Sequence, residues 1–327
     1  TNGSRPGVAT NVSDSTASLT YNGNINKSNS AALLSVVNHS TGTLTFQNGT
    51  LDGFTGTGLR FDNADGTYNF TGALSLSGVA LGINILNGSS GTFGFGTGTH
   101  IHANSGDAFV LTDSNANLTY SGDITAIGTH VVRIDNHDAG TITFQTGTLM
   151  GSGALGIDVV NSNGGAVNFN GQVTLNTGAS TAVTLDSNAG STVTFNAAGS
   201  GLAIVTSSGT GFLVSGGGTV NVLGANNSIV TDSGTLLNVS NATASATTLN
   251  LNFANVRNTL GANGILISRT AGTLNGNVNI ASGTITATNR GVDIDGGTLS
   301  LSYGGTIATG GTTARSVETT NITGGGG

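Results

Sequence analysis

The chain contains no cysteine and no tryptophan, a single proline and a single methionine, and charged residues make up only 7% of its 327 residues. The lack of cysteine excludes disulfide bonds, thiol catalysis and cysteine-based zinc sites. No uninterrupted apolar run is long enough for a transmembrane helix, so we expect no membrane insertion in this segment. The net charge of −7 and the lack of a basic patch exclude nucleic acid as an expected partner.

A short motif of the type Thr-Ile-Thr-Phe recurs about every 25 residues and organises the chain. Clear copies occur at residues 18–21, 43–46, 67–70, 92–95, 117–120, 141–144, 166–169 and 192–195. Less regular copies follow at residues 219–222, 248–251, 273–276 and 298–301. A period this regular predicts a solenoid, in which each repeat forms one coil.

Each repeat holds three short segments of alternating apolar and polar residues, for example 166–169, 172–175 and 182–185. Alternation with period two predicts strands with one buried face, and the intervening Gly, Asn, Asp and Ser predict turns. A short polar residue follows the third segment and marks a corner, as at Asn38, Asp62, Asn87 and Asp135. We predict an all-β fold, a right-handed parallel β-helix (three-sided solenoid) of about 12 coils of about 25 residues.

The repeat continues without a linker, which predicts a single solenoid domain. We assign residues 1–16 to a flexible lead-in or a preceding coil, residues 17–310 to the parallel β-helix, and residues 311–327 to a last partial coil and a glycine-rich tail. Solenoid ends normally carry a cap that blocks the open sheet edges. Because the final glycines supply no such cap, we interpret the chain as a segment of a longer protein.

The aromatic residues are expected inside the rod. Eight of the 12 Phe and 4 Tyr share one repeat position: Tyr21, Phe46, Phe70, Phe95, Tyr120, Phe144, Phe169 and Phe195. Phe54, Phe253 and Tyr303 have no assigned place. Polysaccharide-binding grooves use exposed aromatic platforms, which this chain hardly supplies. We therefore predict no catalytic site, no cofactor and no enzymatic activity, and keep a polysaccharide-active β-helix enzyme as an alternative.

Four aspartates at two matching corners are candidate calcium ligands: Asp62, Asp65, Asp135 and Asp138. Carboxylate oxygens are the ligands that calcium prefers. The two corners are two or more coils apart, however, and they lack the strict repeat of calcium-binding β-rolls. We favour turn capping for these aspartates and predict no metal site.

Two histidines flank Ile101, so His100 and His102 point to the same outward face of one strand. Two imidazoles at this spacing could share a metal ion, but metal sites in proteins usually have three or four ligands. His130 falls on a different strand of the next coil. We interpret His100 and His102 as exposed polar residues.

The outward residues of the first strand form two columns rich in Thr and Asn. They define a candidate contact strip that contains Thr43, Thr45, Thr67, Thr92, Thr119, Thr141, Thr143, Thr192 and Thr194. Ice-binding solenoids use Thr-x-Thr strips of this kind, although strand propensity and Asn ladders produce the same pattern and the second column is irregular. Flat polar faces can also associate side by side through many weak hydrogen bonds.

The Gly-Thr-Ile-Thr-Phe-like strands at residues 42–46, 91–95 and 140–144, with Asn and Gly corners and scarce Lys and Pro, resemble passenger regions of large bacterial surface proteins. These include autotransporter adhesins and filamentous-haemagglutinin-like exoproteins. The resemblance covers roughly residues 17–310 and implies secretion to the surface of a Gram-negative bacterium. It implies a non-enzymatic extracellular rod or adhesin stalk whose partner is a host or bacterial surface ligand or a second copy. An ice-binding solenoid is the alternative.

Overall fold

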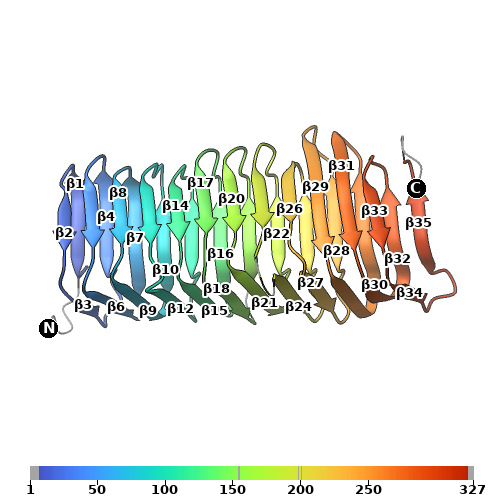
Figure 1. The fold of residues 1–327 in the computed structure, drawn as a ribbon, viewed down its shortest axis with the longest axis horizontal. Helices are drawn as coiled ribbons and strands as arrows, with labels where there is room; N and C mark the ends of the chain where they lie inside the picture. The colour runs from blue at the N-terminus through green and yellow to red at the C-terminus, as the bar shows by residue number, and fades with distance from the viewer. Residues whose placement is uncertain (1–6, 154, 198, 200, 323–327) are drawn as a thin grey trace.

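The computed structural model describes residues 7–153, 155–197, 199 and 201–322. These residues form 35 β-strands and no helix, and the strands stack along one axis into a long rod (Figure 1). Strands that pair are parallel and come from successive repeats, about 25 residues apart. The chain is therefore a parallel β-solenoid of about 12 turns, which confirms the predicted fold class.

The strands form three faces, and the first face contains the recurring motif. It is a 12-stranded parallel sheet. In stacking order its strands are β2 (Leu19–Tyr21), β5 (Thr43–Phe46), β8 (Thr67–Phe70), β11 (Thr92–Phe95), β14 (Asn117–Tyr120), β17 (Thr141–Phe144), β20 (Ala166–Phe169), β23 (Thr192–Phe195), β26 (Gly218–Val222), β29 (Ala246–Phe253), β31 (Thr273–Ile280) and β33 (Ser300–Tyr303).

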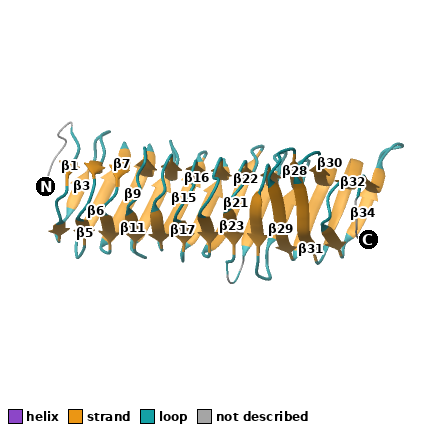
Figure 2. Ribbon diagram, turned by 90° about the horizontal axis from the view of Figure 1, so that it is seen from above, coloured by secondary structure: helices purple, strands orange, loops and turns teal. Residues whose placement is uncertain are grey.

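The second face follows the first in each coil. It contains β3 (Ile25–Lys27), β6 (Thr50–Phe54), β9 (Ala73–Val79), β12 (Thr99–Ala103), β15 (Asp123–Ile127), β18 (Thr148–Ser152), β21 (Gln172–Gly178), β24 (Leu202–Thr206), β27 (Ser228–Thr231) and β34 (Thr306–Thr309). Figure 2, seen from above, labels several of these strands along the rod, among them β3, β6, β9, β15 and β21.

The third face completes each coil. It contains β1 (Thr10–Ser15), β4 (Leu34–His39), β7 (Thr57–Ala64), β10 (Leu81–Leu86), β13 (Phe109–Thr112), β16 (His130–Asp135), β19 (Gly156–Val160), β22 (Val183–Asp186), β25 (Phe212–Ser215), β28 (Leu237–Asn241) and β35 (Arg315–Thr320). Two long strands, β30 (Asn255–Arg269) and β32 (Gly283–Asp295), pair with both the second and the third face. They join these two faces into one 23-stranded sheet.

The interior is filled by the alternate, inward residues of all three faces. On the first face the predicted aromatic column forms a stack. The rings of Phe144 and Phe169 are 5.1 Å apart and those of Phe169 and Phe195 are 4.7 Å apart, with interplanar angles of 1° and 10°. Parallel pairing places each ring over its equivalent in the next coil, so the strand spacing itself sets the stacking distance.

Aromatic residues from the third face meet this stack edge-on and extend the core beyond it. Phe212 contacts both Phe195 and Phe253, with ring centroids 5.8 Å and 6.1 Å apart. Phe253 is fully buried, and Tyr303 packs partly buried against the same core, whereas Phe54 is 41% exposed. The three aromatic residues without a predicted place therefore divide into two core residues and one surface residue.

The register of the eleventh coil corrects the motif assignment at residues 273–276. Leu249 pairs with Gly276 and Leu251 pairs with Val278, so the equivalent motif lies two residues later than predicted. The aromatic position is therefore occupied by Val278 and not by Gly276. At Gly276 a Cβ would lie 2.0 Å from the carbonyl oxygen of Leu249. The backbones of the two coils are too close there for a side chain. Glycine therefore replaces the apolar residue that marks the motif in the other repeats.

Both ends of the described chain continue the solenoid. β1 pairs in parallel with β4, so residues 10–15 belong to a coil that precedes the first copy of the motif. β35 pairs with β32 at the other end. Residues 1–6 of the proposed lead-in and residues 323–327 of the proposed tail lie outside the described residues.

We predict that Phe169→Ala lowers the free energy of unfolding by about 3–5 kcal/mol, because it leaves a cavity between two stacked rings. Phe54→Ala is the control, since Phe54 lies at the surface and is 41% exposed, and it should cost about 0.5 kcal/mol or less. Chemical denaturation of the two variants and the unmodified chain measures both effects. Equal losses for the two variants would contradict a stacked interior.

Candidate functional site

The candidate contact strip lies on the outer surface of the first face. In β5, β8, β11, β14, β17 and β23 its nine threonines alternate with buried residues. Thr43, Thr92, Thr119 and Thr141 are exposed, and the other five threonines are half-buried. Pairing between neighbouring strands aligns these positions along the rod, as from Thr143 to Asn168 and on to Thr194.

The first face carries no charged side chain. All residues of its 12 strands are described, and none is Asp, Glu, Lys, Arg or His. The other two faces carry the charges of the described strands, including Arg60 and Asp62 on β7 and Arg133 and Asp135 on β16. The lack of charge therefore holds for the complete sheet and not only for the candidate contact strip.

Asparagine side chains connect the later coils of the same face. Asn221 Nδ2 donates to Thr194 Oγ1 at 3.2 Å, and Asn250 Nδ2 donates to Asn221 Oδ1 at 2.8 Å. A second row begins with a bond of 2.9 Å from Asn279 Nδ2 to Asn252 Oδ1. Amide side chains stacked in register form such ladders, so these residues stabilise the stacking of coils.

The second column of the strip is interrupted at Gly94, which stands between Asn69 and Thr119 in the paired strands. Beside this position the surface holds a shallow hollow of about 180 Å³ between Thr92, Thr119 and Thr143. The regular hydroxyl lattice that an ice surface requires is therefore broken near the middle of the strip.

The four candidate calcium ligands lie at or directly beside corners, where they accept hydrogen bonds from the next coil. Asp62 Oδ1 and Asp135 Oδ1 accept from Asn87 Nδ2 at 2.9 Å and from Asn161 Nδ2 at 3.0 Å. Asp65 Oδ1 accepts from the amide of Ser90 at 2.9 Å, and Asp138 Oδ1 accepts from the amide of Asn163 at 2.7 Å. These bonds join each aspartate to the coil that follows it.

The corner that follows the third face is built on a left-handed residue. In successive coils this residue is Asp14, Asn38, Asn63, Asn87, Asp113, Asn136, Asn161 and Ser187, with φ between 48° and 60°. The corner assigned to Asp62 and Asp135 is therefore one residue early, because Asp62 lies within the strand β7 and Asp135 is the last residue of β16. Asn and Asp are the side chains that tolerate this conformation best.

His100 and His102 project outward from β12, and both are exposed. The neighbouring strand places Asp123 directly opposite His100, with 3.2 Å between His100 Nδ1 and Asp123 Oδ2. Sequence reasoning missed this aspartate, because the two residues meet only when the coils are stacked in register. His130 lies on β16 of the third face, apart from this pair, as predicted.

His130 is held between two aspartates of the adjacent coils. Its Nδ1 is 2.8 Å from Asp107 Oδ1, and its Nε2 is 3.0 Å from Asp158 Oδ2. Burial alone lowers the pKa of His130, but the hydrogen bonds and charges of the two carboxylates outweigh it and raise the pKa to about 9. Likewise, burial raises the pKa of Asp107, but its contacts with His130 lower it overall. The charged imidazole thus links three successive coils.

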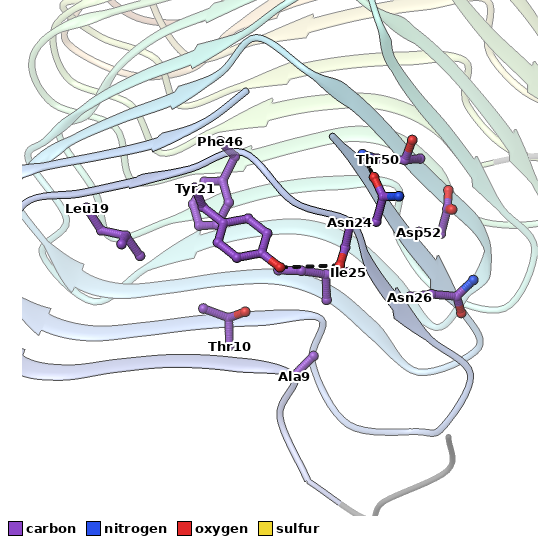
Figure 3. A pocket seen from close by; sticks show the side chains of 10 residues that line it. All are labelled: Ala9, Thr10, Leu19, Tyr21, Asn24, Ile25, Asn26, Phe46, Thr50 and Asp52. Atoms are coloured by element: carbon purple, nitrogen blue, oxygen red, sulfur yellow. Dashed lines mark hydrogen bonds between the residues drawn. The ribbon is translucent and has the colours of Figure 1, made fainter. Parts of the chain in front are cut away.

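A hollow of about 840 Å³ is the open mouth of the interior at the N-terminal end (Figure 3). Leu19, Ile25 and Tyr21 line it, and the Tyr21 hydroxyl donates to the carbonyl of Asn24 at 3.3 Å. Asp52 is its one charged lining residue. The other polar side chains that line it are the hydroxyls of Thr10, Tyr21 and Thr50 and the amides of Asn24 and Asn26.

Comparisons of the chain with protein-family models, with curated proteins and with solved structures gave no match. Within the described ranges, no three His, Asp or Glu side chains are grouped so as to hold a metal ion. The same residues contain no helix long and apolar enough to cross a membrane. The functional argument therefore depends on the surfaces of the solenoid.

We predict that Asn136→Ala lowers the free energy of unfolding by about 2 kcal/mol. Alanine is strained in the left-handed backbone conformation at φ 60°. The variant also lacks the 2.7 Å bond from Asn136 Nδ2 to Asp113 Oδ1. Asn136→Gly is the matched control, which loses the same bond but adopts this backbone freely and should cost about 1 kcal/mol. Urea unfolding compares the two, and an alanine variant as stable as the glycine variant would refute the backbone argument.

The His130 bridge predicts a pH dependence of stability. The folded pKa of about 9 lies above the usual value of about 6.5 for an unfolded chain. The bridge therefore stabilises fully below pH of about 6.5, and this stabilisation is lost as the pH rises toward 9. A shift of this size corresponds to roughly 3 kcal/mol.

Urea unfolding of the unmodified chain and of His130→Gln between pH 6 and pH 9.5 tests this dependence. We expect the unmodified chain to lose stability over this range and the difference between the two proteins to shrink as the pH rises. A difference that stays constant across the range would show that His130 is neutral in the folded chain.

Proposed function

We propose that this chain is a non-enzymatic, extracellular structural rod or adhesin stalk that makes contacts through its first face. The observation that carries the proposal is the uncharged Thr and Asn surface that runs along all 12 strands of that face. At the corners, by contrast, several polar side chains already bond to the neighbouring coil, as Asn87 does to Asp62 and Asn161 does to Asp135.

The chemistry of the first face suits lateral association. Two uncharged faces meet without leaving a desolvated, unpaired charge, and their hydroxyl and amide groups can donate and accept across the contact. At a strand spacing of about 4.8 Å and a rise of about 3.3 Å per residue, the face measures on the order of 700 Å². Stable protein interfaces bury about 600–1,000 Å² on each partner. One face is therefore large enough for a specific contact.

The pattern resemblance to autotransporter adhesins and filamentous-haemagglutinin-like exoproteins supports a location on the surface of a Gram-negative bacterium. A chain without cysteine suits export through a narrow pore, since no disulfide forms before folding. The partner would be a second copy on a neighbouring rod, or a ligand on a host or bacterial surface.

The test replaces threonines by lysine at half-buried outward positions. The first-face variant carries Thr143→Lys and Thr194→Lys, and the control variant carries Thr174→Lys on the second face and Thr184→Lys on the third. We expect beads coated with the unmodified chain to cluster and to adhere to bacterial or host cells. Clustering and adhesion should be several-fold weaker for the first-face variant, because lysines in a flat contact must be desolvated without partners. The control variant should cluster and adhere like the unmodified chain.

Clustering should also change little between low and high salt, because an uncharged contact is not screened. Equal behaviour of the two lysine variants would contradict a role for the first face. Thermal hysteresis of the purified chain without clustering or adhesion would favour the ice-binding alternative instead.

A further inference from the structure

The second face carries two histidines that are free for a ligand, unlike the other three of the chain. His39 and His137 are fully buried, and both ring nitrogens of His130 face aspartates. His100 and His102 line an open hollow of about 480 Å³ on the outer surface, together with Asp123 and Thr125. Residues two apart on a strand project side by side from the same face, so these two imidazoles can reach one ion between them.

Asp123 is positioned to orient His100. Its Oδ1 accepts a hydrogen bond from the backbone amide of Thr148 at 2.8 Å, which fixes the carboxylate, and its Oδ2 faces His100 Nδ1 at 3.2 Å. A carboxylate beside Nδ1 favours the tautomer that carries its proton on that nitrogen, and this tautomer leaves the lone pair of His100 on Nε2. Metal-binding histidines commonly use their second nitrogen in this way.

We propose that His100 and His102 form a binding site for a divalent transition-metal ion of the zinc, copper or nickel class, with Asp123 as the positioning residue. The protein supplies two nitrogen ligands, and water fills the remaining positions. Neutral imidazole suits these ions, whereas calcium and magnesium prefer oxygen ligands. The site is independent of the contact function proposed for the first face, because it lies on the second.

Isothermal titration of the purified chain with zinc chloride tests the site. We expect one zinc ion per chain and no heat of binding with calcium chloride. His100→Ala and His102→Ala should each weaken zinc binding at least 100-fold, since a single imidazole remains. Asp123→Asn keeps an acceptor for the Thr148 amide but loses the charge beside His100, and it should weaken binding about 10-fold to 100-fold.

Thr125→Val is the matched control, because it lies opposite His102 in the same hollow and removes no nitrogen ligand. It should bind zinc like the unmodified chain. All the altered residues lie on the outer surface of the sheet, and circular dichroism checks that each variant is folded. Unchanged zinc binding by a His100→Ala, His102→Ala double variant would overturn the proposal, and unchanged binding by Asp123→Asn would remove Asp123 from it.

Discussion

The structure depends on one constraint, the in-register stacking of parallel strands at about 4.8 Å. Each residue lies against its equivalent in the coils before and after it, so a side chain persists in a column only where copies of it attract one another. Phenylalanine satisfies this condition by ring stacking, as Phe144 and Phe169 do. Asparagine satisfies it through amide hydrogen bonds, as Asn221 and Asn250 do. The recurring motif in the sequence is a record of these self-compatible columns.

The same constraint governs charge. Like charges repeated every 4.8 Å would repel, so a column of one charged residue type is excluded. The described structure places charges outside the first face and pairs several of them on the third, where Arg60 contacts Asp62 and Arg133 contacts Asp135. His130 gains its charge from carboxylates on both sides. Stacking therefore favours columns without charge, and a face made only of such columns is also suited to contact with an uncharged partner surface.

Periodicity was sufficient to predict the parallel solenoid, the aromatic column and the outward position of the threonine strip, because each follows from residues within one repeat. It failed where contacts depend on how far one coil is displaced against the next. The motif predicted at residues 273–276 lies two residues later, because Gly276 stands opposite Leu249 where the backbones are too close for an apolar side chain. Asp123 beside His100, and Asp107 and Asp158 around His130, come from different coils whose lengths vary. No spacing along the chain identifies such pairs.

Stacking also limits where a function can reside in a solenoid of this kind. Inward residues fill the core, and many corner and ladder residues form their hydrogen bonds with the neighbouring coils. Groups that can meet a partner therefore belong to the outward columns of the strands. The threonines of the first face repeat in such columns and suit an extended contact of many weak bonds. His100 and His102 occur in a single coil and suit a single ion. An extended partner and a point ligand would thus use different faces, and changing one face should leave the other intact.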